Sequence, residues 1–243
     1  MFKTACFILF VLSGFIIEKY RAQINSIQLG GITTTINPIT TAVPFLLISP
    51  DSKQGAMGDV GVATEPDVQS THWNVGKLAF ADRKMAFGLT ATPWLRSLVP
   101  DIFLYYLSSY YKLNKRQCVS TSLRYFTLGN IELTDAQGTR TGNFKPNEFA
   151  LDLGFSQQLS KIFGLGVSMR YINSSISRVY FNGSTGNAAS SVAVDLGGYL
   201  KPNRFKWGER DMTWTGGFLF SNVGAKIKYS NDENFLPMNL RLG

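Results

Sequence analysis

Apolar and polar residues alternate with a period of two along several segments of the chain. Within residues 118–127, Leu123 and Tyr125 share one parity, whereas Ser122 and Arg124 belong to the other. The same split recurs at residues 149–156, 163–171, 192–197 and 214–221. Alternation over this length predicts β-strands with one apolar face, because a helix would repeat every 3.6 residues.

Two earlier segments and the last residues extend this series of strands. Residues 85–90 alternate in the same way, whereas residues 101–113, "DIFLYYLSSYYKL", are apolar on both faces, which leaves their register open. The closing "PMNLRLG" predicts the beginning of an eighth strand. The pattern therefore predicts an all-β chain of seven strands and part of an eighth.

Either a soluble β-sandwich or a transmembrane barrel would produce this alternation. After the first residues, no apolar run approaches the roughly 18 residues that a membrane helix needs, but strands can also cross a bilayer. The polar parity is occupied by Gly, Ala, Ser, Thr, Asp and Arg, which suit a polar lumen better than a soluble core. This composition favours the barrel modestly.

The positions of the aromatic residues on the apolar parity favour the barrel more strongly. These residues cluster at strand ends: Tyr125 and Tyr171 end their strands, and Phe163 and Trp214 begin theirs. Aromatic rings at both ends with aliphatic residues between them are typical of the interfacial girdles of outer-membrane barrels. We therefore predict a transmembrane antiparallel β-barrel.

Connection lengths agree with a barrel. Only "NKRQ" and "LSKI" separate two pairs of strands, whereas residues 128–146 and 173–190 form long polar links. Short periplasmic turns and long extracellular loops are the usual asymmetry of such barrels. The link at residues 201–211 falls on the short side but is longer than the other turns.

Seven strands and part of an eighth cannot close a barrel, because an open edge in hydrocarbon leaves backbone groups unpaired. We therefore expect residues 77–243 to form the N-terminal part of a larger barrel in a chain that is truncated. The missing part should supply several further strands.

The first 22 residues have the features of a secretory signal peptide. Lys3 precedes an apolar run at residues 5–17, and the small residue Ala22 marks the expected cleavage position. Export removes Cys6 with the leader, so Cys118 has no partner for an intramolecular disulfide. The predicted localisation is the outer membrane of a Gram-negative cell.

The chain has a formal net charge of +8, and it stays basic after the leader is removed. Export argues against nucleic acid as a partner. The remaining interpretations are a solvated basic face, contact with lipopolysaccharide phosphates, or an acidic partner, and the solvated face is the simplest of them.

An irregular segment at residues 23–76 precedes the first strand. It is rich in Gly, Pro, Ala and Thr, and "GAMGDVGVA" at residues 55–63 offers small residues that let backbone approach a wall closely. A barrel interior tolerates irregular backbone because polar groups and water can satisfy it. We predict a hatch, called the hatch segment below, with these key residues: Asn37, Pro38, Pro44, Phe45, Gly55, Met57, Gly58, Asp59, Gly61, His72, Trp73 and Asn74.

Four charged residues on the polar parity are predicted to face the lumen. Arg124, Asp152, Arg170 and Asp195 lie on consecutive long strands, where opposite charges on neighbouring strands can pair. Such pairs would either satisfy one another as a structural ladder, or fix the hatch segment and set the polarity of the pore.

The run from Asn37 to Asn74, together with "SNVGAKIKY" and "LPMNLRLG", resembles the PorV family of the type IX secretion system. PorV is itself similar to the FadL fatty-acid transporters, which share a "GDVGVA"-like hatch followed by a "WN" element. The resemblance implies a barrel of fourteen strands. The chain departs from the family pattern at residues 74–80, "NVGKLAF", where Asn-Pro would be expected.

The resemblance implies a non-enzymatic role in protein secretion. Such proteins receive the C-terminal signal domain of cargo from the large outer-membrane translocon. They then carry the cargo to a surface complex whose sortase-like protease joins it to lipopolysaccharide. Cargo contacts would fall on the loops at residues 128–146, 173–190 and 222–236. The alternative is a FadL-like passage for hydrophobic small molecules.

Catalysis and metal binding were weighed against these roles. The family has been linked to lipid A deacylation, but a serine nucleophile usually needs a histidine base, and His72 lies in the hatch segment without a recognisable catalytic motif. We expect His72 to be a packed residue. Four acidic residues of the hatch segment could bind a hard cation, but turn and cap roles are commoner for such residues: Asp51, Asp59, Glu65 and Asp67. We therefore expect no enzyme activity, cofactor or metal.

Overall fold

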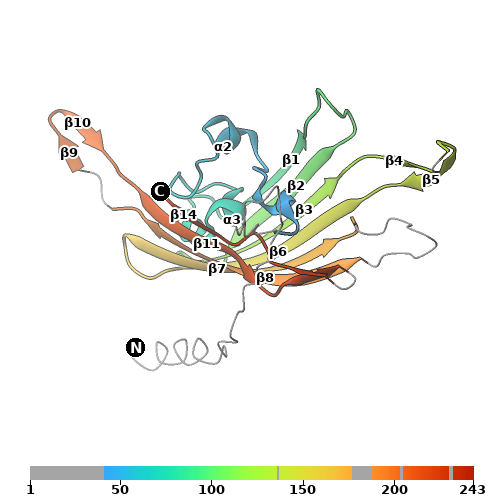
Figure 1. The fold of residues 1–243 in the computed structure, drawn as a ribbon. Helices are drawn as coiled ribbons and strands as arrows, with labels where there is room; N and C mark the ends of the chain where they lie inside the picture. The colour runs from blue at the N-terminus through green and yellow to red at the C-terminus, as the bar shows by residue number, and fades with distance from the viewer. Residues whose placement is uncertain (1–40, 136, 177–187, 203–204, 230–231) are drawn as a thin grey trace, which may run out of the picture. The chain divides into compact units, whose positions relative to one another are not determined.

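An eight-stranded antiparallel sheet organises the residues that the structure describes (Figure 1). The computed structural model describes residues 41–135, 137–176, 188–202, 205–229 and 232–243. The predicted signal peptide and the predicted hatch residues Asn37 and Pro38 lie outside these ranges. The strands follow one another in the order β1-β2-β3-β6-β7-β8-β11-β14, so each pairs with the next long strand along the chain.

The strands coincide with the segments that alternation predicted. They are β1 (Met85–Pro93), β2 (Phe103–Lys112), β3 (Gln117–Thr127), β6 (Asn147–Gln158), β7 (Phe163–Ser174), β8 (Ala189–Leu200), β11 (Gly216–Gly224) and β14 (Asn239–Leu242). The all-β class and the antiparallel sheet are therefore confirmed. Several strands extend beyond the predicted segments, as β8 does at both ends. At β11 both boundaries shift, because Trp214 lies just before the strand and Asn222 belongs to it rather than to the following loop.

Three small hairpins lie in the connections between these strands. They are β4 (Ile131–Thr134) with β5 (Arg140–Phe144), β9 (Phe205–Trp207) with β10 (Arg210–Met212), and β12 (Ile227–Tyr229) with β13 (Asp232–Asn234). The β9–β10 hairpin accounts for the unexpected length of the link at residues 201–211. We call the end of the sheet with the turns at 113–116 and 159–162 the short-turn end, and the opposite end the long-connection end.

The two faces of the sheet differ in the opposite sense from a soluble protein. Leu153 and Met169 are 61% and 59% exposed, whereas Asp152 and Arg170 at the neighbouring positions are 0% and 2% exposed. The apolar parity therefore lies on the exposed face and the polar parity on the buried face. This arrangement is what a strand needs when hydrocarbon covers one side.

An aromatic row crosses the exposed face near the long-connection end. Tyr105 on β2 lies opposite Tyr125 on β3, which lies opposite Phe149 on β6. The rings of Tyr105 and Tyr125 are 6.5 Å apart, and those of Phe149 and Tyr171 are 6.1 Å apart. A row of aromatic rings at one level is typical of a membrane interface. None of the helices in the described ranges has the length and apolar character of a membrane-crossing helix.

The described part of the hatch segment packs against the buried face of the sheet. It contains four short helices, which are η1 (Pro44–Leu47), α2 (Ser52–Ala56), α3 (Ser70–Trp73) and η2 (Val75–Phe80). Figure 1 shows α2 and α3 on one side of the curved sheet. η2 contacts β6, β7 and β8, so the segment crosses several strands before it enters β1.

The sheet has two edges within the described residues, because β1 pairs only with β2 and β14 only with β11. A closed barrel is therefore not seen among these residues. Closure into the fourteen-stranded family barrel stays a prediction.

Candidate functional site

Glycines on the buried face of the sheet let the hatch segment approach its backbone. A Cβ atom at Gly166 would lie 2.7 Å from the backbone nitrogen of Gly76, and one at Gly164 would lie 2.9 Å from the oxygen of the same residue. Real side chains do not tolerate such contacts. The inward-facing glycines of β7 thus allow the backbone of η2 to pack directly against the strand.

Asn74 joins three parts of the molecule. Its Oδ1 accepts a hydrogen bond from the backbone N–H of Gly76 at 3.0 Å, which begins η2. Its Nδ2 donates to the backbone oxygens of Val62 and Gly198, each at 2.9 Å. Because Asn74 is fully buried, these bonds fix the hatch segment to β8 in one register.

Trp73 and Lys77 hold the interior of the hatch segment together. The indole Nε1–H of Trp73 donates to Asp51 at 2.7 Å, and Asp51 also caps α2 through the backbone N–H of Gln54. The ammonium of Lys77 donates to the oxygen of Gly61 at 2.7 Å. Burial, only partly offset by nearby carboxylates, lowers the pKa of Lys77 to about 8.

Arg170 forms the centre of a buried ionic cluster on the sheet. Its Nε lies 2.5 Å from Oδ1 of Asp152 on β6, and its Nη2 lies 2.9 Å from Oδ2 of Asp195 on β8. A third contact joins Nη1 to Oδ1 of Asn222. Ser122 donates a further hydrogen bond to Asp152 at 2.7 Å. Arg170 thus links four of the strands on their buried face.

A bulge in β11 brings Asn222 into this cluster. The pairing with β8 shifts register between Phe220 and Val223, and Asn222 adopts a left-handed φ of 59°. As a result, the neighbouring residues Ser221 and Asn222 are both buried. The backbone N–H of Asn222 donates to Asp195 at 2.7 Å, so the bulge completes the hydrogen bonding of that carboxylate.

Arg124 faces the hatch segment rather than the carboxylates. Its Nη2 lies 2.5 Å from Nδ1 of His72, and its Nη1 donates to the backbone oxygen of Leu46 at 2.7 Å. Its guanidinium also lies over the ring of Tyr106, 5.6 Å from the centroid. Burial first, and the neighbouring Arg124 second, lower the pKa of His72 well below its ordinary value. His72 is therefore a neutral acceptor that ties α3 to β3.

An apolar group of side chains, the mouth cluster, fills the buried face near the long-connection end. Phe45 of η1 stacks on Phe126 of β3 with 6.2 Å between ring centroids. Ile227 and Leu236 from the β11–β14 connection pack into the same cluster. The backbone N–H of Ala42 donates to the oxygen of Phe235 at 2.9 Å. The β11–β14 connection is thus folded against the hatch segment.

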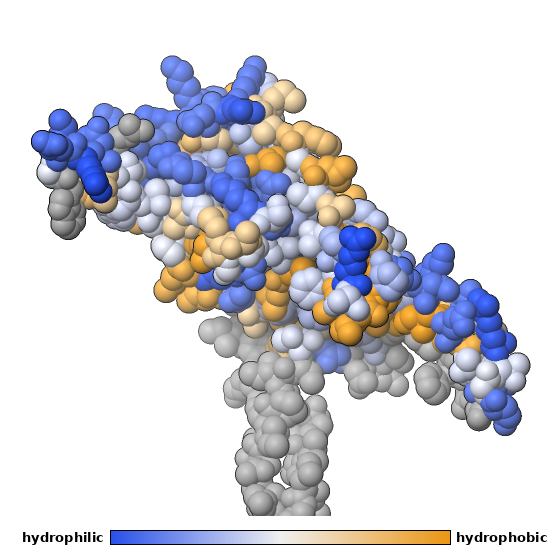
Figure 2. Space-filling model, turned by 90° about the horizontal axis from the view of Figure 1, so that it is seen from above, coloured by the Kyte–Doolittle hydropathy of each residue, from blue (hydrophilic) through white to orange (hydrophobic). Residues whose placement is uncertain are grey.

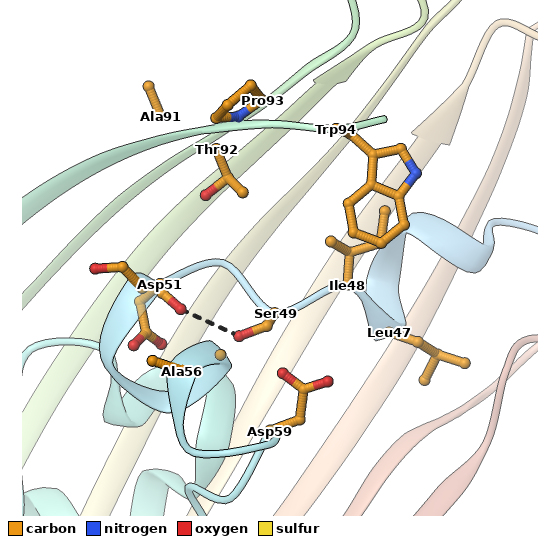
Figure 3. Close-up of a pocket in the computed structure, with 12 residues that line it drawn as sticks. Leu47, Ile48, Ser49, Asp51, Ala56, Asp59, Ala91, Thr92, Pro93 and Trp94 are labelled. Atoms are coloured by element: carbon orange, nitrogen blue, oxygen red, sulfur yellow. Dashed lines mark hydrogen bonds between the residues drawn. The ribbon is translucent and has the colours of Figure 1, made fainter. Parts of the chain in front are cut away.

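A cavity of about 570 Å³ lies between the hatch segment and the inner side of β1. Figure 3 shows Asp51 and Asp59 on the hatch side and Thr92 and Trp94 on the strand side. The lining is mixed, with aliphatic and hydroxyl groups on both sides. Asp59 is exposed and adopts a left-handed φ of 61°.

The predicted site residues fall into two groups. Phe45, Gly61, His72, Trp73 and Asn74 are buried and contact one another or the sheet, as do all four predicted lumen charges. Pro44, Gly55, Met57, Gly58 and Asp59 are exposed on the hatch segment. Sequence reasoning missed Lys77 and Asn222, which lie at a departure from the family pattern and at a bulge.

The acidic residues of the hatch segment take separate structural roles. Asp51 caps α2, Asp67 accepts hydrogen bonds from Gln54 and Ser70, and Glu65 pairs with Lys201 at 2.8 Å. Within the described ranges, no group of three or more His, Cys, Asp or Glu residues is arranged to hold a metal ion.

An apolar exposed face, an ionic buried face and a segment packed against that buried face define an all-β protein of the outer-membrane type. The model of the family described as type IX secretion system protein PorV matches residues 32–243, which is nearly the whole chain. The chain therefore belongs to the PorV family, an outer-membrane component of that secretion system. A search of curated proteins returned no match.

Proposed function

We propose that this protein binds the C-terminal signal domain of type IX cargo at the large translocon and carries the cargo to the surface attachment complex. The family match over residues 32–243 carries the proposal. In this role the sheet is the wall of a barrel in the outer membrane, and the hatch segment fills its interior. The long-connection end faces the cell exterior and lipopolysaccharide, and the sortase-like protease receives the cargo there.

The β4–β5 hairpin is the part of the long-connection end best suited to bind cargo. It forms a two-stranded sheet of its own and extends past the ends of β3 and β6 (Figure 1). Ile131 at its start is 45% exposed. An exposed hairpin with strand edges can pair with an added strand and offer side chains for specificity. The β11–β14 connection is less available, because Ile227 and Leu236 are buried in the mouth cluster.

Binding rather than catalysis agrees with the state of the buried polar groups. His72 accepts a hydrogen bond from Arg124, and Arg170 is engaged by Asp152 and Asp195. The first contact fixes the hatch segment to the wall, and the second links neighbouring strands within the wall. The family match gives no support to a passage for hydrophobic small molecules.

A pull-down with a purified cargo signal domain tests the proposal. The full-length protein in detergent should retain the domain, and Ile131→Asp should weaken retention about tenfold or more if Ile131 is an anchor of the interface. Leu159→Asp is the matched control, because Leu159 is also exposed but lies at the short-turn end. Equal retention by both variants would exclude the hairpin, and no retention by the unaltered protein would refute the cargo role.

A further inference from the structure

Basic residues gather at the short-turn end of the sheet. The exposed ones come from each connection at that end: Arg83, Lys84, Lys115, Arg116, Lys161, Lys206 and Arg210. Only Asp82, Glu209 and Asp211 oppose them in the same described connections. Figure 2 shows strongly hydrophilic residues at both ends of the view, with further hydrophilic and hydrophobic residues intermixed between them.

The long-connection end lacks this excess of positive charge. Its described basic residues are nearly balanced by carboxylates in the same connections, with five of the former, Arg96, Arg140, Lys145, Lys226 and Lys228, and four of the latter, Asp101, Glu132, Asp135 and Glu233. Arg140 lies 3.3 Å from Glu132. Among the described residues, the excess of positive charge therefore lies at the short-turn end and is not spread over both ends of the sheet.

The basic residues of the short-turn end have few partners within the protein. Among the described residues, the ion pair at this end joins Lys201 to Glu65 of the hatch segment. None of the ion pairs found in the described ranges involves Lys115, Arg116 or Lys161. The backbone of these three residues lies on the turns at 113–116 and 159–162, so their charges lie near one level at the end of the sheet.

Exposed apolar side chains accompany the basic ones on the same turns. Leu113 precedes Lys115 and Arg116, and Leu159 and Ile162 flank Lys161. Trp214, 53% exposed, lies just before β11. Cationic side chains beside aromatic and aliphatic ones are what a membrane interface selects. A soluble partner would be bound by a single patch of cationic and apolar residues. Here the combination recurs on successive turns along the rim, as contact with a membrane surface requires.

We propose that the short-turn rim binds the anionic headgroups of phospholipids such as phosphatidylglycerol in the adjoining leaflet. This rests on the proposed function insofar as the sheet must span a membrane. Each basic residue near a negative membrane surface strengthens attraction by about fivefold in affinity. The unpaired cations would therefore enrich anionic lipid around this end and fix the depth of the sheet in the bilayer.

Tryptophan quenching by brominated lipid tests the proposal at the short-turn rim. The full-length protein is reconstituted into phosphatidylcholine vesicles that contain phosphatidylglycerol, with bromine on one lipid or the other. The signal of Trp214 is the fluorescence difference between the unaltered protein and Trp214→Phe. We expect brominated phosphatidylglycerol to quench Trp214 by more than the bulk fraction of this lipid predicts.

Two triple variants with equal loss of charge separate the rim from a general effect. Lys115→Gln/Arg116→Gln/Lys161→Gln should lower the enrichment at Trp214 several-fold, and 0.5 M salt should do the same for the unaltered protein, because the Debye length is then about 4 Å. Arg140→Gln/Lys145→Gln/Lys226→Gln should leave the enrichment unchanged. Substitutions on exposed turns rarely prevent folding, and a heat-shifted gel band verifies it.

The outcomes distinguish this proposal from the proposed function. Equal quenching of Trp214 by both lipids would overturn the lipid proposal, whereas retention of cargo by the same protein would leave the cargo role intact. An unchanged lipid preference in the rim variant would also overturn it, and an acidic protein would then be the partner to seek. Absence of quenching by either lipid would show that the sheet is not in the bilayer, which refutes the membrane part of both.

Discussion

Replacing Arg170 with leucine should strongly destabilise the folded protein. The substitution removes the only cation that lies between Asp152 and Asp195 in the described structure, and both carboxylates are at most 2% exposed. Asn222 would lose its contact with Nη1 as well. Two buried carboxylates would then face each other without a counter-charge.

The size of the effect follows from these contacts. Removing one partner of a buried ion pair costs about 3–5 kcal/mol, because the remaining charge is left without compensation. Loss of a hydrogen bond to a buried amide adds about 1–3 kcal/mol. Partial protonation of the carboxylates and entry of water offset some of this cost, so we expect about 4 kcal/mol for Arg170→Leu.

The change in the free energy of unfolding is measured by urea titration of the refolded protein in detergent. The gel shift of the heat-stable band reports the folded fraction. Arg140→Leu is the control, because Arg140 also pairs with a glutamate but both side chains are more than half exposed, so its loss should change stability by less than about 1 kcal/mol. The triple variant Arg170→Leu/Asp152→Asn/Asp195→Asn should recover most of the loss. Equal stability of Arg170→Leu and Arg140→Leu would refute the reasoning.

Three further perturbations test the attachment of the hatch segment. Burial and a neighbouring guanidinium hold the pKa of His72 below 6.5. The unfolded state therefore binds one proton more than the folded state at acid pH, and the free energy of unfolding should fall as the pH drops below about 6.5. His72→Asn, which keeps a hydrogen-bond acceptor, should flatten this part of a pH–stability curve. Gly166→Val should drive a side chain against Gly76 and cost about 1–3 kcal/mol, seen as faster proteolysis of the hatch segment while the wall stays resistant. The paired positions Thr41 and Phe235 should form a disulfide when both are replaced by cysteine, and the oxidised protein should keep its compact gel band at a higher temperature than the reduced one. An unchanged pH dependence of stability in His72→Asn would contradict the first prediction, and an unchanged rate of hatch cleavage in Gly166→Val the second. Free thiols in the oxidised double-cysteine variant would contradict the third.

The strands could be predicted from the sequence because their signal is local. Consecutive residues of a strand, such as Leu123 and Arg124, point to opposite faces of the sheet, so the face that each occupies follows from alternation alone. The register of residues 101–113 could not be predicted, because both parities are apolar there. Pairing with β1 and β3 settles it, with Leu104 and Tyr106 on the buried face.

The contacts of the candidate site were less accessible to sequence reasoning. Inward positions of Arg124 and Arg170 followed from parity, and Arg170 pairs with aspartates of neighbouring strands as the charge pattern suggested. The contact of Arg124 with His72 of the hatch segment did not follow from parity. The hatch helices have four to six residues each, too few to show a period. The bulge that turns Asn222 inward leaves no signature in residue type.

The bridge between Thr41 and Phe235 has a consequence for how the molecule is assembled. It joins positions separated by most of the described sequence, so it closes a very long loop of chain. Contacts of such long range slow folding, because the chain loses much entropy before they are made. The bridge is therefore expected to form late in folding, after local contacts such as the hairpins between neighbouring strands. Packing of the β11–β14 connection against η1 would then complete the attachment of the hatch segment.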